Sequence, residues 1–143
     1  MKNLHIRFAA SGVVVVLLCA CNGFLGWSGE GQRLGIISFY NDPIVIEVPD
    51  TVASGLMFQV RVRTYGGGCI TQGHTDVRVD GLRVTVTPYD IHSGGNVCTT
   101  ELRLFQHEAA VRFDRVGTAT VAVRGMRRPD DQTITEERTV VVN

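Results

Sequence analysis

The stretch Leu82-Arg83-Val84-Thr85-Val86-Thr87 alternates strictly between apolar and polar residues, and it directly follows an Asp80-Gly81 pair. A period of two places the leucine and the valines on one face of an extended strand and the polar residues on the other, as in a half-buried β-strand. Asp-Gly between two such runs indicates a tight hairpin turn, and Val77 and Val79 supply the preceding strand. We expect Pro88 to end this ladder, because proline has no backbone N–H to donate.

The same alternation continues along most of the chain, and no segment shows the 3.6-residue period of an amphipathic helix. Further strands are expected in residues 36–40, 44–48, 58–63, 102–104, 109–114, 119–123 and 134–142. A parallel sheet is not expected, because the sequence shows no helices that could form the crossover connections. The sequence therefore predicts an all-β fold, a two-sheet antiparallel sandwich of about seven or eight strands with Greek-key connections.

The first twenty residues have the pattern of an export signal. Lys2 and Arg7 precede a run of 13 uncharged residues from Phe8 to Ala20. As a helix this run would span about 20 Å, whereas the hydrocarbon core of a bilayer is about 30 Å thick. The segment therefore predicts a signal peptide that is cleaved, rather than a permanent membrane span.

Leu18-Cys19-Ala20-Cys21 follows the apolar run and resembles the bacterial lipobox, with a cysteine at the second position as a mild departure. The resemblance implies that Cys21 is acylated and becomes the mature N-terminus. It also implies an anchor in the bacterial cell envelope, facing the periplasm or the exterior. Asn22 in place of aspartate favours the outer membrane in a Gram-negative cell. The alternative is an ordinary secretory signal cleaved near Ala20.

The residues after Cys21 are rich in glycine, with five glycines between positions 22 and 35. Such a composition is typical of a flexible tether. We therefore expect a signal peptide in residues 1–20, the lipidated cysteine and a tether in residues 21–35, and one sandwich domain in residues 36–143.

Residues 42–143 resemble the bacterial immunoglobulin-like domains of envelope and secreted proteins. The resemblance rests on residues 46–52, on Gly55 with Phe58-Gln59-Val60, and on residues 117–123 in the closing hairpin. It implies an immunoglobulin-like sandwich that presents loops or sheet edges to a protein or a glycan. The antibody-type pattern is absent, because Trp27 lies outside the cysteine pair.

Cys69 and Cys98 are the two cysteines left once Cys19 is removed and Cys21 is lipidated. In an oxidising compartment such a pair predicts a disulfide. Free thiols, metal ligation and redox catalysis are the alternatives, although a dithiol enzyme normally carries Cys-x-x-Cys. The bridge would join the segment after Tyr65 to the one after Pro88.

A candidate binding edge follows from this bridge, because rigidly held loops on a sandwich commonly carry binding. Its residues flank the two cysteines in segments expected to be loops, and they are Tyr65, His74, Tyr89, Asp90 and His92.

Three histidines offer an alternative function, a periplasmic site for zinc or copper. His74, His92 and His107 would supply the nitrogen ligands, together with Asp76 or Asp90. Neither His-x-His nor His-x-x-x-His spacing is present, so this site requires segments that are distant in the sequence to converge.

Catalytic and nucleic-acid functions find little support. Ala53-Ser54-Gly55 lacks the first glycine of the Gly-x-Ser-x-Gly elbow, and no cofactor motif is present. The 14 basic and 14 acidic residues leave no basic surplus for nucleic acid. The sequence therefore favours a non-enzymatic binding or structural module without a cofactor.

Overall fold

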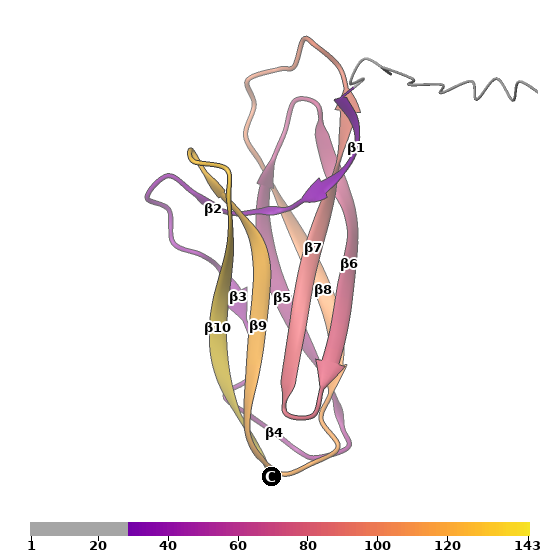
Figure 1. Cartoon of the computed structure of the whole chain (residues 1–143), viewed down its shortest axis with the longest axis vertical. Helices are drawn as coiled ribbons and strands as arrows, with labels where there is room; N and C mark the ends of the chain where they lie inside the picture. The colour runs from indigo at the N-terminus through magenta and orange to yellow at the C-terminus, as the bar shows by residue number, and fades with distance from the viewer. Residues whose placement is uncertain (1–28) are drawn as a thin grey trace, which may run out of the picture.

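The computed structural model describes residues 29–143, which form an all-β sandwich (Figure 1). Within these residues no helix has the length and apolar character needed to cross a bilayer. The strands are β1 (Gly29–Leu34), β2 (Ile36–Phe39), β3 (Ile46–Glu47), β4 (Thr51–Val52), β5 (Met57–Gly66), β6 (Ile70–Asp80), β7 (Arg83–Gly94), β8 (Arg103–Arg112), β9 (Gly117–Arg128) and β10 (Gln132–Val142).

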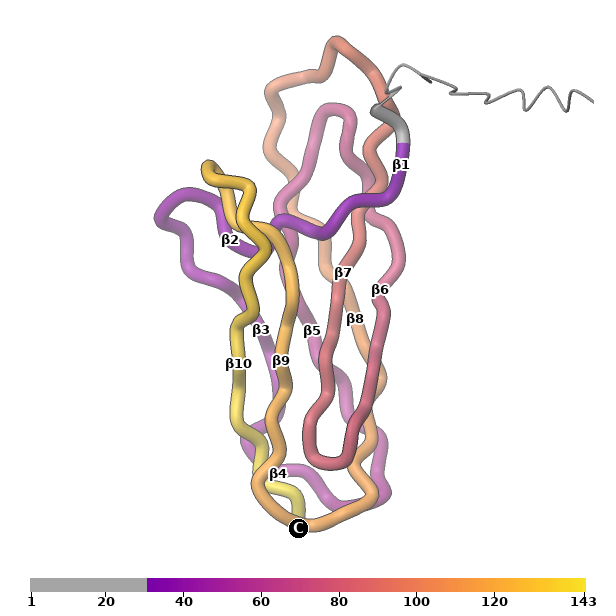
Figure 2. Tube along the Cα trace, in the orientation of Figure 1, coloured from indigo at the N-terminus to yellow at the C-terminus, as the bar shows by residue number. Residues whose placement is uncertain are grey.

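The strands lie in two layers. One layer contains β6, β7, β9 and β10 in that order, with β4 beside β10, and the other contains β8, β5 and β3. β1 pairs with β7, and β2, which follows it, pairs with both β9 and β5, so β2 connects the two layers (Figure 2). This crossing lies at the end of the sandwich opposite the C-terminus (Figure 1).

Most strand pairs are antiparallel, as expected, but β7–β9, β2–β9 and β10–β4 are parallel. Parallel neighbours need a long crossover connection, which is usually a helix. Here β8 takes that role for β7 and β9, because it passes through the opposite layer between them. Parallel pairing therefore occurs without a helix.

The core lies between the layers and follows the alternation in the sequence. Val84 and Val86 of β7 are fully buried, as are Val60 and Val62 of β5. The Phe58 and Phe113 rings pack with their centroids 5.7 Å apart. The predicted inward faces of these strands are thus confirmed, and hydrophobic burial along them stabilises the sandwich.

Pro88 does not end its strand, contrary to the sequence prediction. β7 continues to Gly94, and Pro88 lies opposite Thr75 at a bulge, where the register of β6 shifts between Gln72 and Thr75. Proline is tolerated at a bulge, because a ladder hydrogen bond is already missing there. The residues after Pro88 therefore lie in a strand and not in a loop.

The expected tether also differs from the structure. Gly29–Leu34 form β1 and pair with residues 89–94 of β7, so the folded region begins before residue 36. Gly35 follows, and a Cβ atom there would lie 2.6 Å from Thr64 Cγ2, so only glycine fits this crossing. The predicted signal peptide, Cys21 and residues 21–28 of the tether lie outside the described residues.

Candidate functional site

The predicted disulfide between Cys69 and Cys98 is present, with a Cα–Cα distance of 5.2 Å. Cys69 lies in the turn between β5 and β6, and Cys98 lies between β7 and β8. Gly68 adopts a positive φ of 60° in this turn, and the Ile70 amide donates to the Gly67 carbonyl. The glycine-rich segment is thus a defined turn that the disulfide connects to the β7–β8 segment.

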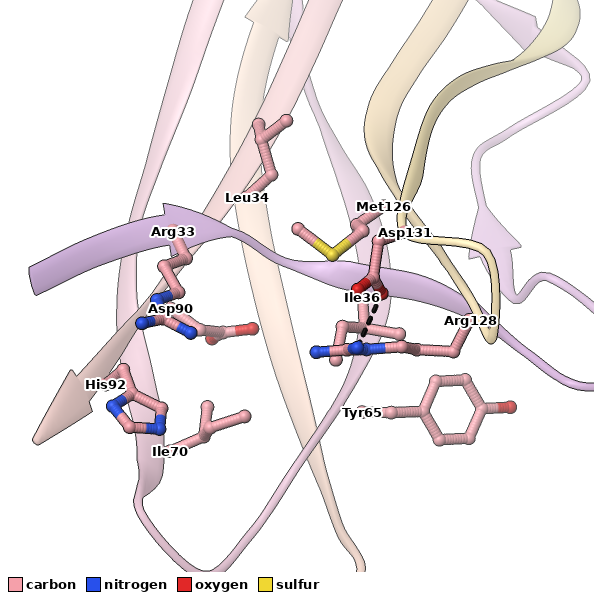
Figure 3. Close-up of a pocket in the computed structure, with 10 residues that line it drawn as sticks. All are labelled: Arg33, Leu34, Ile36, Tyr65, Ile70, Asp90, His92, Met126, Arg128 and Asp131. Carbon is pink, nitrogen blue, oxygen red and sulfur yellow. Dashed lines mark ion pairs between the residues drawn. The ribbon is translucent and has the colours of Figure 1, made fainter. Parts of the chain in front are cut away.

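A cavity of about 220 Å³ lies at the same end of the sandwich, beside the crossing of β1 and β2 (Figure 3). Its lining combines apolar side chains with two arginines, two aspartates, a tyrosine and a histidine. The lining residues are Arg33, Leu34, Ile36, Tyr65, Ile70, Asp90, His92, Met126, Arg128 and Asp131.

Asp90 is the most buried charged residue of this lining, with 3% of its surface exposed. His107 Nε2 lies 3.1 Å from Asp90 Oδ1, whereas Asp90 Oδ2 has no hydrogen-bond partner within residues 29–143. In Figure 3 the carboxylate points into the space between Arg33 and Ile36. The Oδ2 atom is itself fully buried, so the surrounding protein encloses this carboxylate oxygen.

His107 holds Asp90 in this orientation. The imidazole is itself buried, and its Nδ1 atom lies 3.0 Å from Thr75 Oγ1. A carboxylate oxygen accepts, so His107 Nε2–H donates to Asp90 Oδ1, and Nδ1 shares the second hydrogen bond with the Thr75 hydroxyl. Because Thr75 is on β6, Asp90 on β7 and His107 on β8, the chain of hydrogen bonds joins the two layers.

Hydroxyl, imidazole and carboxylate also occur in this order in hydrolytic triads, where the hydroxyl faces the substrate. Here the opposite end of the chain faces the cavity, because Asp90 lines it and Thr75 does not. The arrangement therefore positions the Asp90 carboxylate and does not present Thr75 as a nucleophile to this cavity.

A second hollow of about 210 Å³ adjoins the first and shares Ile36, Tyr65, Ile70 and Arg128 with it. The residues that only the second hollow contains are Phe39, Gly66, Gly67 and Leu102. The Phe39 and Tyr65 rings stack with their centroids 5.4 Å apart. Burial, with a smaller contribution from Asp42, raises the pKa of the Tyr65 hydroxyl, so Tyr65 is a neutral donor at neutral pH.

The structure brings three residues of the candidate binding edge together. Tyr65, Asp90 and His92 line the cavity. His74 and Tyr89 do not line it; their rings stack on one another at a centroid distance of 5.2 Å, on β6 and β7. His74 also lies 3.3 Å from Asp76.

The three histidines of the alternative metal site are not gathered in residues 29–143. The one close group of three potential ligands in this part of the chain is Cys69, His92 and Cys98, with ligand atoms within 4.8 Å of one another. Its two sulfur atoms are bonded to each other. His92 Nδ1 accepts a hydrogen bond from the Gly94 amide at 3.0 Å. His107 instead forms hydrogen bonds with Asp90 and Thr75.

The sequence pattern does not predict most of the cavity lining. Arg33 and Leu34 fall in the expected tether, and Arg128 and Asp131, which form an ion pair, fall in a turn expected to be solvated. Ile36 and Met126 become neighbours only through the parallel pairing of β2 with β9. No local pattern marks this long-range pairing.

Three comparisons with known proteins give no match, whether to a family model, to a curated protein or to a solved structure. The interpretation of the site therefore rests on its own residues.

Proposed function

We propose that this chain is a non-enzymatic, lipid-anchored protein of the bacterial cell envelope whose immunoglobulin-like sandwich acts as a binding module. The observation that carries the binding role is the cavity at the disulfide end, whose lining combines apolar side chains with the polar groups of Tyr65, Asp90 and His92. An apolar cavity with a few convergent polar groups is the usual form of a ligand site.

The anchor is proposed from the lipobox-like Leu18-Cys19-Ala20-Cys21. Gly29, where β1 begins, is 29 − 21 = 8 residues after Cys21. Eight extended residues reach at most about 28 Å. A lipid at Cys21 would therefore keep the start of β1, and with it the disulfide end of the sandwich, close to the membrane surface.

The partner is proposed to be a protein or a glycan that contacts this end. Leu102 supports an interaction there, because it lines the second hollow and is 55% exposed. Leu104 is exposed nearby on β8. Exposed apolar side chains beside a cavity are typical of interaction sites.

Site-specific crosslinking in the native cell tests the binding role. A photoreactive residue at Leu102 is compared with one at Leu56, which is 64% exposed and lies between β4 and β5 at the opposite end. We expect a discrete adduct from position 102 and none from position 56. Adducts from position 56 alone, or the same adducts from both positions, would contradict the proposed binding end.

Acyl labelling tests the anchor separately. The wild-type protein should incorporate a labelled fatty acid, and Cys21→Ala should accumulate as an unprocessed precursor without label. Normal labelling of Cys21→Ala would refute the assignment of the anchor. Uptake of zinc or copper by the oxidised protein would instead favour the alternative metal-binding function.

A further inference from the structure

We propose that the exposed edge of β6 pairs with the same edge of a second copy of this chain, so that two sheets join into one across a two-fold axis. This β6 edge consists of residues 74–80, none of which lines either hollow at the disulfide end. The inference therefore goes beyond the proposed function. It depends neither on the lipid anchor nor on what the cavity binds.

The first argument is the exposure of two valines on this strand. β6 pairs with β7 on one side, and no other strand of the described chain pairs with it (Figure 1). Val77 and Val79 lie on the core side of the sheet, opposite Val86 and Val84 of β7. The two β7 valines are fully buried, whereas Val77 is 40% and Val79 is 47% exposed. An edge strand with exposed apolar side chains is suited to be covered by another strand.

The second argument is the direction of the backbone groups at this edge. Asp80 and Arg83 face each other across a two-residue turn, and such a closing pair is hydrogen-bonded. Hydrogen-bonded and non-hydrogen-bonded pairs alternate along an antiparallel ladder. Val77 and Val79 therefore direct their N–H and C=O groups away from β7. An added strand can continue the ladder through these groups, as in β-strand addition.

The third argument is the pattern of charge on the β6 edge. Asp76, Arg78 and Asp80 alternate in sign along the outer face of the strand. His74 Nε2 lies 3.3 Å from Asp76 Oδ1. Arg78 and Asp80 form no ion pair with any of the residues that the structure describes. A strand that brings opposite charges beside these two residues would complement the edge.

The β6 edge itself is such a strand when two copies pair antiparallel with Val77 opposite Val77 on the two-fold axis. In this register Asp76 faces Arg78 of the second copy, and His74 faces Asp80 of the second copy. The axis repeats both pairs. Moving the axis by one residue places Asp76 or Arg78 opposite its own copy, and like charges directly opposite each other are destabilising. The charge pattern thus selects a second copy as the partner.

Strand β10 also has an edge, because β4 pairs only with its last residues, but this edge is blocked. The Val141 amide donates to Asp50 on the side away from β9, so the backbone groups of Glu137 point the same way. The Glu137 carbonyl already accepts a hydrogen bond from Arg138 Nη1 at 2.9 Å. Arg138 also forms an ion pair with Glu136 in its own strand. Such cover is a common protection of edge strands.

The antiparallel arrangement leaves the candidate binding site uncovered. β6 runs from the disulfide end at Ile70 to the β6–β7 turn after Asp80. In the proposed dimer the two disulfide ends therefore point in opposite directions. Residues 74–80 form a short contact compared with the roughly 20–30 residues a side of a stable interface, so we expect a reversible dimer.

Two cysteine substitutions test the pairing and its register in the purified, oxidised protein, with detergent micelles in excess. Val77→Cys should give a disulfide-linked dimer, because Cα atoms of a hydrogen-bonded pair lie about 5.5 Å apart, within the range of a disulfide. Val79→Cys is the matched control on the same face, since it would lie about 14 Å from its own counterpart. Non-reducing electrophoresis measures the dimer. No dimer from Val77→Cys, or at least as much from Val79→Cys, would overturn the proposal.

Charge exchange tests the complementarity of the edge in the Val77→Cys protein. Arg78→Glu should lower the yield of dimer about tenfold, because Asp76 would then face a glutamate. Asp76→Arg combined with Arg78→Asp should restore the yield, since the opposite charges face each other again. Arg124→Glu is the control, because Arg124 is exposed on the same outer face but on β9, away from the edge. Thermal unfolding confirms that each variant folds. An unchanged yield with Arg78→Glu, or no recovery on exchange, would overturn the proposal.

The outcome is distinguishable from that of the proposed binding role. A dimer from Val77→Cys without adducts at position 102 would support the pairing of the β6 edges and contradict the proposed binding end. Adducts at position 102 without a dimer from Val77→Cys would support the binding end and refute the pairing.

Discussion

His107 Nε2 lies 3.1 Å from Asp90 Oδ1, and this buried contact joins β8 in one layer of the sandwich to β7 in the other. The two residues are 17 positions apart in the sequence. Asp90 also belongs to the lining of the cavity at the disulfide end. One hydrogen bond thus connects the packing of the two layers with the proposed binding site.

His107→Ala should destabilise the fold strongly, because it leaves a buried carboxylate without its hydrogen bond. Loss of a buried hydrogen bond to a charged group costs about 1.5–3 kcal/mol in the free energy of unfolding. Denaturant titration measures the change. His74→Ala is the control, since His74 is exposed, and it should cost no more than about 1 kcal/mol. Equal effects of the two substitutions would contradict the structural role of His107.

Cys69→Ser should lower the stability of the protein, because the disulfide closes a loop with a sequence separation of 29 residues. The chain-entropy model gives about 3–4 kcal/mol for a loop of this size. Thermal unfolding under oxidising conditions measures the loss, and reduction of the wild-type protein should reproduce it. A melting temperature that neither change affects would show that the bridge does not stabilise the fold.

Val121→Ala should destabilise the protein by about 2 kcal/mol, because it removes buried methyl groups between the layers. Val97→Ala is a matched control: the chemistry is the same, but Val97 is 94% exposed, and the expected change is within about 0.5 kcal/mol. Denaturant titration of both variants checks the prediction. A small effect at position 121 would mean that β9 does not face the core.

Arg127→Gln should raise the pKa of Asp130. The hydrogen bond from Arg127 holds the pKa of this carboxyl below its ordinary value of 3.8. A lowered pKa in the folded state means that the pair stabilises the fold above about pH 3.8 and that this contribution is lost as the pH falls through the lower folded value. Carboxyl NMR titration checks the shift. Arg112→Gln, which removes the separate pair with Asp114, should leave the pKa of Asp130 unchanged.

The sequence predicts the fold where the pattern is local. Val84 and Val86 alternate with threonines, and a period of two is enough to place them in the core of a sandwich. The prediction from sequence fails for Pro88, because the bulge opposite this proline depends on β6. It also fails for β1, because Gly29–Leu34 form a strand only by pairing with β7.

The same distinction holds for the candidate site. Tyr65, Asp90 and His92 were predicted because they are close in sequence to the two cysteines. Met126 and the Asp90–His107 contact were not predicted, since they depend on a parallel strand pair and on contact between the two layers. The positions of the cysteines thus predict which end of the sandwich carries the candidate site. The contacts among the side chains of this site follow only from the three-dimensional structure.

The intact mass of the protein extracted from membranes under non-reducing conditions tests the central claim most directly. The account predicts a chain that begins at Cys21, carries acyl groups there, and gains the mass of two hydrogen atoms when the Cys69–Cys98 bond is reduced. A chain that keeps residues 1–20, or one without acyl groups whose mass does not change on reduction, would contradict it.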